Sequence, residues 1–130
     1  MISAGGGISQ SPGTSITVAG LSNLTASGNT ISLNQLNNNF GTIQASGTQL
    51  TLAEQNNITL HNIAVSSTVN ITSADRISIT GTYSAANTLL NSGVLAAATL
   101  LTTNLTINGN TTSANIQTGG NLSGAAIVNA

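Results

Sequence analysis

The sequence is almost without charge. Its 130 residues include one Lys or Arg, two Asp or Glu and one His, which gives a formal net charge of -1. Typical globular domains carry charge on about a quarter of their residues. With no basic stripe to neutralise phosphates, we expect no binding to nucleic acid. Attraction to an anionic membrane surface is excluded by the same argument.

Cysteine and tryptophan are absent, and Pro, Met, Phe and Tyr occur once each. No disulfide can form, which is compatible with any compartment. The longest apolar run, VLAAATLL over residues 94–101, is too short for a membrane span, which takes about 20 residues. We therefore expect no membrane insertion. The opening MISAGGGISQSPG has no signal-peptide pattern, so an exported form would have lost its signal or belong to a longer parent chain.

Side chains for catalysis are scarce as well. The titratable candidates are Glu54, His61, Asp75, Arg76 and Tyr83. General acid-base catalysis needs two groups within hydrogen-bond reach, and the spacing of Glu54 and His61 places them on different faces of a repeat unit. No GxSxG element accompanies the many serines. We predict that the chain is not an enzyme and has no catalytic residues.

Metal and cofactor sites lack their usual ligands. There is no Cys, a single His and no GGxGxDx calcium repeat. We therefore predict no metal site, no cofactor and no cofactor-binding residues. Phe40 and Tyr83 are expected to pack in strands or at corners and not to form a ligand platform.

The sequence is instead repetitive. Ile31 and Leu33 recur as Leu50 and Leu52, and again as Val69 and Ile71, at steps of about nineteen residues. Toward the C-terminus the step shortens to about sixteen or seventeen. Each unit contains short stretches with period-2 alternation, such as LTL and ISI, which is the pattern of a strand. Clusters of Gly, Asn and Ser between them favour turns.

Stretches this short cannot form stable hairpins alone, but stacking each one on its equivalent in the next repeat buries a continuous apolar column. We therefore predict an all-β fold: a parallel β-solenoid of about seven coils of roughly 16–20 residues. Residues 1–130 form one domain, with residues 1–13 as a flexible or capping segment. A helix competes only at VLAAATLL, where Ala is abundant.

The alternation also predicts which side chains face outward. The middle residues of the apolar triplets form one outward column, namely Thr17, Ser32, Thr51, Asn70, Leu90, Thr106 and Ser123. Thr42, His61 and Thr80 form a second. Neutral side chains suit such columns, because like charges repeated about every 4.8 Å would repel one another. Low charge is thus a requirement of stacking.

Part of the chain resembles a known family. LNNNFGTIQASGTQLTL over residues 36–52 and NTLLNSGVLAAATLLTTNLTINGN over residues 87–110 are similar to the haemagglutinin repeats of filamentous haemagglutinin-type adhesins, the exoproteins of two-partner secretion systems. The resemblance implies a right-handed β-helix on the bacterial cell surface. The C-terminal stretch LTINGNTTSANIQTGGNLSGAAIVN also resembles phage tail-fibre repeats.

These observations predict a structural and adhesive extracellular rod. It is either a segment of a large surface adhesin or a subunit that stacks end to end through its exposed coil edges into a filament. Its partners would be other copies of the chain and a host or neighbouring cell surface. A phage tail-fibre shaft is the alternative. An ice-binding solenoid is a weaker one, because the first outward column mixes Ser, Asn and Leu.

Overall fold

A computed structural model describes the backbone of residues 1–97, 100–113, 116–118, 122–123 and 126–129, and the side chains of residues 1–92 and 102–108. The described backbone forms strands and connecting turns, with no helix. Five long strands carry the fold: β3 (Thr17–Leu33), β4 (Asn39–Glu54), β5 (Ile58–Ser73), β6 (Arg76–Ala97) and β7 (Leu100–Ser113). Shorter strands flank them: β1 (Ile2–Ala4), β2 (Ile8–Ser9), β8 (Ile116–Thr118), β9 (Leu122–Ser123) and β10 (Ala126–Asn129).

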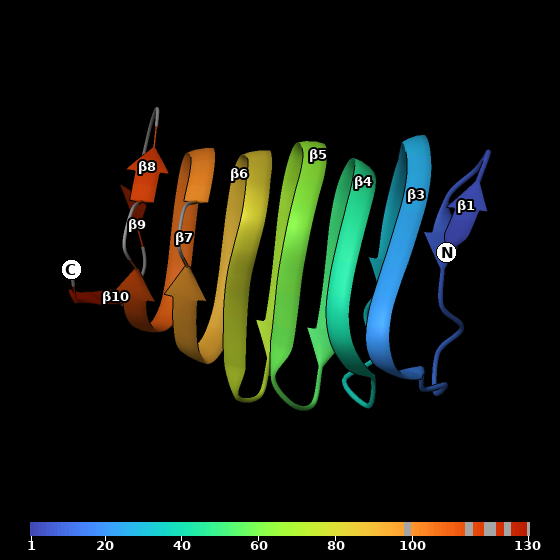
Figure 1. The fold of residues 1–130 in the computed structure, drawn as a ribbon, viewed down its shortest axis with the longest axis horizontal. Helices are drawn as coiled ribbons and strands as arrows, with labels where there is room; N and C mark the ends of the chain where they lie inside the picture. The colour runs from blue at the N-terminus through green and yellow to red at the C-terminus, as the bar shows by residue number, and fades with distance from the viewer. Residues whose placement is uncertain (98–99, 114–115, 119–121, 124–125, 130) are drawn as a thin grey trace.

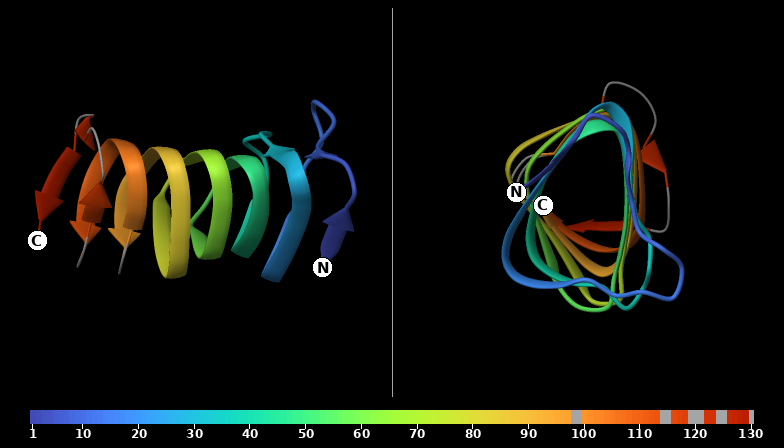
Figure 2. Two further views of the ribbon diagram at one scale, coloured as in Figure 1. Left: turned by 90° about the horizontal axis from the view of Figure 1, so that it is seen from above. Right: turned by 90° about the vertical axis from the view of Figure 1, so that its right-hand side faces the viewer.

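The strands form a parallel β-solenoid, as predicted. Each long strand pairs in parallel with the next one along the chain, in the order β3, β4, β5, β6, β7. Figure 1 shows them side by side along the long axis. Seen from the end, they superimpose as one closed coil with a rounded triangular outline (Figure 2). The chain therefore winds around a single core that runs along the axis.

The residues that the structure describes form about five turns, so the predicted count of seven is too high. Thr17 and Ser32, which were assigned to two different coils, lie in the same long strand β3. Ser123 belongs to the two-residue strand β9, which pairs with only part of β7. At about 4.8 Å per turn, five turns span roughly 24 Å along the axis, less than the 30–35 Å that seven would give.

The nineteen-residue step is confirmed by the strand register. Ile31 pairs with Leu50, and Leu50 pairs with Val69. One turn further on, Val69 pairs with Thr88, and the step then falls to seventeen where Thr88 pairs with Leu105. The stretch proposed as an alternative helix is extended: β6 continues to Ala97 and β7 begins at Leu100, while residues 98–99 lie outside the described part.

The core is a set of apolar columns that run along the axis. One column contains five residues that are each at most 3 % exposed, namely Leu33, Leu52, Ile71, Leu90 and Ile107. A second contains Ile31, Leu50, Val69 and Leu105, with the buried polar residue Thr88 between the last two. Each turn thus buries its apolar side chains against their equivalents in the neighbouring turns, which is how a repeat too short to fold alone is stabilised.

Two glycines of the stretch GTIQASG, residues 41–47, allow neighbouring turns to approach closely. A Cβ at Gly41 would collide with the backbone carbonyl of Ala19 in the preceding turn. A Cβ at Gly47 would lie 2.8 Å from the carbonyl oxygen of Asn29. Both contacts are with backbone atoms, which cannot move aside cheaply. The glycines in this motif are therefore explained by stacking.

The predicted outward columns need three corrections. Leu90 is fully buried, and the outward position of its turn belongs to Leu89, which pairs with Asn70. Thr17 pairs with Asn39 and not with the middle residue of an apolar triplet. The remaining members are in register, because Ser32, Thr51 and Asn70 pair in succession and Thr106 pairs with both Leu89 and Ser123.

The second outward column is correct for only two of its three residues. His61 pairs with Thr80, and its ring Nδ1 lies 3.1 Å from the Thr80 hydroxyl oxygen. Thr42 instead pairs with Thr59, because the register shifts twice along β4, between Ile43 and Ala45 and between Gly47 and Gln49. The first shift occurs where Asn62 adopts a positive φ of 55°, a conformation that Asn tolerates better than most residues.

Candidate functional site

The titratable side chains do not converge on one site. Glu54 lies inside the solenoid at a corner, whereas His61 is half-buried on the outer face. Asp75 and Arg76 are exposed beside the turn between β5 and β6. Among the residues whose placement is described, no three His, Cys, Asp or Glu side chains lie close enough to hold a metal ion.

Buried polar side chains do gather at one corner of the solenoid, where the chain passes from each long strand to the next. We call Asn38, Glu54 and Ser73 the corner residues. Their exposed fractions are 0, 0 and 4 %. The connections at this corner are residues 34–38, 55–57 and 74–75. Their backbones also bond to one another, since the Gln55 N–H donates to the Asn38 carbonyl and the Ala74 N–H donates to the Glu54 carbonyl.

Asn38 uses its whole amide. Its Oδ1 accepts hydrogen bonds from the Ile16 backbone N–H at 2.9 Å and from the Gln10 side chain at 2.7 Å. Its Nδ2 donates to Gln10 Oε1 at 2.9 Å and to the Leu33 carbonyl at 3.1 Å. Asn38 therefore satisfies backbone groups of the preceding turn and of its own turn at once.

The other two corner residues follow the same plan. The Glu54 carboxylate accepts the Phe40 backbone N–H at 2.8 Å and the Asn56 N–H at 3.4 Å. The Ser73 hydroxyl donates to the Asn56 carbonyl at 2.7 Å. Phe40 and Asn56 precede their partners by fourteen and seventeen residues. Glu54 thus joins the two ends of β4 where the turn closes, and Ser73 fastens the end of β5 to the connection that precedes this strand.

Burial raises the pKa of the Glu54 carboxyl above its ordinary value of 4.5, and backbone N–H groups of Phe40, Asn56 and Gln55 oppose the rise. A carboxyl with a raised folded-state pKa holds a proton that the unfolded chain has already released. Its stabilising contribution is therefore complete below the unfolded pKa and is lost as the pH rises through the folded pKa.

We accordingly expect the melting temperature to fall as the pH is raised from about 4 to 7. In the Glu54→Gln variant, which carries no charge in either state, the fall should be smaller. Circular dichroism melts at several pH values measure both. Asp75→Asn is the matched control, because it removes the exposed one of the two acidic side chains and leaves the buried Glu54 in place, so the fall should persist. A melting temperature that rises with pH, or a slope that survives in Glu54→Gln, would contradict the assignment.

Tyr83 lies inside the solenoid, where its hydroxyl is 2.9 Å from the Thr88 hydroxyl. Thr88 donates onward to Thr102 at 3.0 Å. Burial raises the pKa of the Tyr83 phenol well above its ordinary value. This interior chain of hydroxyls explains why a polar residue, Thr88, takes an inward position in the apolar column, and why Leu89 beside it faces outward.

On the outer surface, registered polar side chains bond along the stack. Asn104 donates to Asn87 at 2.8 Å, and Asn108 donates to Asn91 at 2.6 Å. Together with the contact between His61 and Thr80, these bonds link neighbouring turns without using charge. Of these residues, only His61 and Thr80 belong to a predicted outward column; the two asparagine pairs lie at positions that the sequence analysis did not name.

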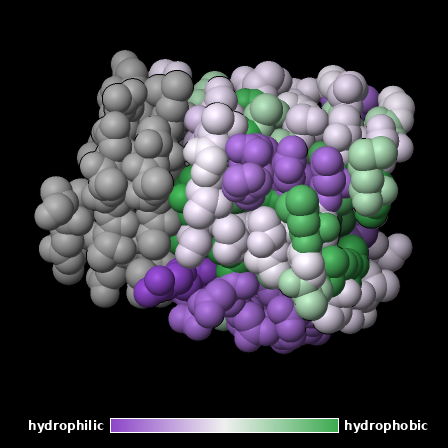
Figure 3. Space-filling view, viewed as in Figure 1, coloured by the Kyte–Doolittle hydropathy of each residue, from purple (hydrophilic) through white to green (hydrophobic). Residues whose placement is uncertain are grey.

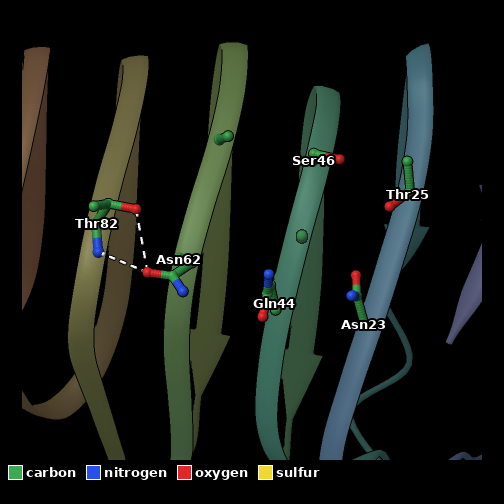
Figure 4. A pocket seen from close by; sticks show the side chains of 8 residues that line it. Asn23, Thr25, Gln44, Ser46, Asn62 and Thr82 are labelled. Atoms are coloured by element: carbon green, nitrogen blue, oxygen red, sulfur yellow. Dashed lines mark hydrogen bonds between the residues drawn. The ribbon is translucent and has the colours of Figure 1, made fainter.

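One part of the outer surface is hollowed. A groove of about 270 Å³ crosses β3, β4, β5 and β6. Its lining residues are Asn23, Thr25, Gln44, Ala45, Ser46, Asn62, Ala64 and Thr82. Figure 4 shows the amide and hydroxyl side chains on four successive strands, facing the viewer. On the same face, hydrophilic residues form a row along the axis (Figure 3). Sequence reasoning missed this groove, because no motif marks it.

A second, apolar hollow of about 220 Å³ lies near the start of the chain, where Met1, Ile2, Val18 and Leu21 contribute to its lining. Met1, Ile2 and Leu21 are among the exposed large apolar side chains. Nearby, β1 and β2 pair with only Leu24–Ala26 and Ile31–Ser32 of the long strand β3. Within the described residues, the first part of β3 therefore has a strand partner on the β4 side alone.

Comparison with known proteins identifies a repeat family. Residues 1–46 and 47–100 each match the family described as repeats of unknown function (DUF5649). No curated protein and no solved structure matches the chain. In the part of the chain that the structure describes, no helix is long and apolar enough to cross a membrane.

Proposed function

Because the chain belongs to this family of repeats, we propose that it is a structural rod segment of an extracellular, bacterial cell-surface adhesin. The observation that carries the proposal is the unbroken parallel stack from β3 to β7, in which each turn pairs with the next in register. A stack of this kind gains length by adding turns, and each turn needs only its neighbours for stability. The resemblance of residues 36–52 and 87–110 to adhesin repeats supports the adhesin assignment.

Near-neutrality supports a mechanical role. The registered outward pairs are built from amides, hydroxyls and one imidazole, so no Asp, Glu, Lys or Arg side chains face one another in them. Among the described residues, Asp75 and Arg76 are the only charged residues that are adjacent in the sequence, and they lie at an exposed turn. A rod built this way stacks equally well at low and high salt, because little of its cohesion comes from exposed charges.

The rod proposal is tested by adding whole turns. Ile58 pairs with Ile77, so residues 58–76 are one complete turn that ends where the next begins. Inserting three extra copies of residues 58–76 after Arg76 should lengthen the particle by about 14 Å, at roughly 4.8 Å a turn, while keeping the β-rich spectrum. Small-angle X-ray scattering and circular dichroism measure the two quantities.

The matched control carries the same three insertions with their residues in scrambled order. It should lose the fold, because apolar side chains then face outward. If the in-register insertions unfold the protein as the scrambled ones do, the turns are not additive and the rod proposal fails. Antibody labelling of intact producing cells tests the proposed location, and labelling only after lysis would oppose it.

A self-stacking filament is the second candidate, favoured by the open stretch of β3 and the apolar hollow beside it. Electron microscopy of the chain at micromolar concentration separates the two. Long unbranched filaments would indicate end-to-end stacking of subunits. Dispersed particles would favour a segment whose neighbouring turns come from the same polypeptide. A trimer in solution would instead support the phage tail-fibre alternative.

A further inference from the structure

The groove across β3–β6 differs from the rest of the polar surface in how its side chains are used. Asn23 pairs with Gln44 and Thr25 pairs with Ser46, so the two amides and the two hydroxyls are in register. Among the described residues, however, none of these four side chains makes a hydrogen bond within the protein. Elsewhere, registered amides bond to each other, as Asn87 and Asn104 do. The groove therefore keeps its donors and acceptors available.

Asn62 lies at the other end of the groove, where hydrogen bonds to the next strand hold its side chain. Its Oδ1 accepts hydrogen bonds from the Thr82 backbone N–H at 3.0 Å and from the Thr82 hydroxyl at 3.2 Å, as the dashed lines in Figure 4 show. The Asn62 Nδ2 has no partner in the described part of the chain. The positive φ of Asn62 and the neighbouring Gly81, with φ of 70°, hold this side chain in place. Ala64, also in the lining, is too small to fill the hollow beside it.

The chemistry of the lining selects a neutral ligand rich in hydroxyl groups. No lining residue is charged or titratable, so there is no partner for a phosphate, a carboxylate or an ammonium group. Amides and hydroxyls each offer a donor and an acceptor, which matches the hydroxyls of sugars. A bound peptide strand would need a free sheet edge, whereas this groove presents side chains on the face of paired strands.

The arrangement of the lining residues also sets the direction in which a ligand would lie. Asn23, Gln44, Asn62 and Thr82 lie on four consecutive strands, so polar groups recur along the axis at about the strand spacing of 4.8 Å. We propose that this groove binds a neutral, extended oligosaccharide that lies along the solenoid axis across β3–β6. This goes beyond the rod function, because a rod needs no lateral binding site.

Affinity at a single groove is expected to be weak. Phe40 and Tyr83, the aromatic residues of the chain, are both buried, so no ring is available to stack on a sugar. The groove is shallow and leaves much of a ligand in contact with water, and small polar ligands in such sites bind in the millimolar range. Repeated sites along a longer rod would strengthen attachment through avidity.

The test uses the intact chain and a panel of neutral gluco-, galacto- and manno-oligosaccharides of six residues. Binding is followed by NMR titration of the side-chain amide signals of Asn23, Gln44 and Asn62. We expect at least one neutral probe to shift these signals at millimolar concentration. A uronic-acid oligomer of the same length should bind more weakly, because the lining holds no cation.

Two variants complete the experiment. The double variant Asn23→Ala, Gln44→Ala should weaken binding about ten-fold or more, as the loss of two hydrogen bonds predicts. Gln49→Ala is the matched control: it removes an exposed Gln from the same strand β4 but outside the groove, and it should bind as the unaltered chain does. The unaltered chain, the double variant and Gln49→Ala should have the same melting temperature. Weaker binding at an unchanged melting temperature then shows that the groove is altered while the fold is kept.

The proposal is overturned if no neutral probe shifts the groove amides, or if Gln49→Ala weakens binding as much as the groove variant. It is also overturned if the uronic-acid oligomer or an uncharged peptide binds as tightly as the best neutral sugar. None of these outcomes affects the rod proposal, which is decided by the insertion experiment.

Discussion

Replacing Ile71 with Asp is expected to unfold most of the solenoid. Ile71 is fully buried and pairs with Leu52 on one side and Leu90 on the other, so the substitution places a carboxylate in the middle of an apolar column. No basic side chain lies inside the described core to pair with it. An unpaired buried charge costs several kcal/mol, and about 4 kcal/mol or more is a large part of the stability of a domain.

For a chain of this size, such a loss lowers the melting temperature by roughly 15 °C or more. Circular dichroism melts at neutral pH measure it. The matched control is Asn70→Asp, which introduces the same carboxylate one position earlier, on the outward side between Thr51 and Leu89. That variant should melt within a few degrees of the unaltered chain. If the two variants melt alike, the inward and outward assignment along β5 is wrong.

Replacing Asn38 with Ala should produce the second large loss. The substitution leaves the Ile16 N–H and the Leu33 carbonyl without the partners they have inside the corner. Each unsatisfied buried group costs about 1–3 kcal/mol, so a total near 4 kcal/mol is expected. The measurement is again the melting temperature, together with the midpoint of urea unfolding.

Two further variants identify the cause. Asn38→Leu keeps the branched shape and the number of non-hydrogen atoms of the side chain but removes its hydrogen bonds, so it should be destabilised nearly as much as Asn38→Ala. Asn37→Ala removes an exposed amide from the same NNN cluster and should change little. A stable Asn38→Leu protein would mean that the corner needs volume and not hydrogen bonds.

The repeat in the sequence was sufficient to predict the solenoid, because the apolar triplets recur at the step that the strand register uses. Leu90 shows where the alternation stops being informative. In the pair Leu89–Leu90 either residue could face inward, and the choice depends on Thr88, whose inward hydroxyl is satisfied by Tyr83 and Thr102. Tyr83 lies five residues earlier in the same strand and Thr102 lies in the next strand, and the alternation of apolar residues marks neither of them as a partner of Thr88.

The corner and the groove were beyond sequence reasoning for similar reasons. Asn37, Asn38 and Asn39 are chemically identical, and only the path of the chain decides which of them is buried. Glu54 was considered as a catalytic candidate, although its carboxylate is occupied by backbone N–H groups at the corner. The groove combines side chains from β3, β4, β5 and β6, so it depends on the register between turns, which no single repeat reveals.

The backward reach of the corner residues makes neighbouring parts of the coil depend on one another. Asn38 and Glu54 satisfy N–H groups of earlier residues, and Ser73 bonds to an earlier carbonyl. Opening the coil at this corner therefore leaves a polar group without its partner, from whichever end the opening starts. Under tension, neighbouring turns should therefore unfold together in cooperative groups and not one at a time.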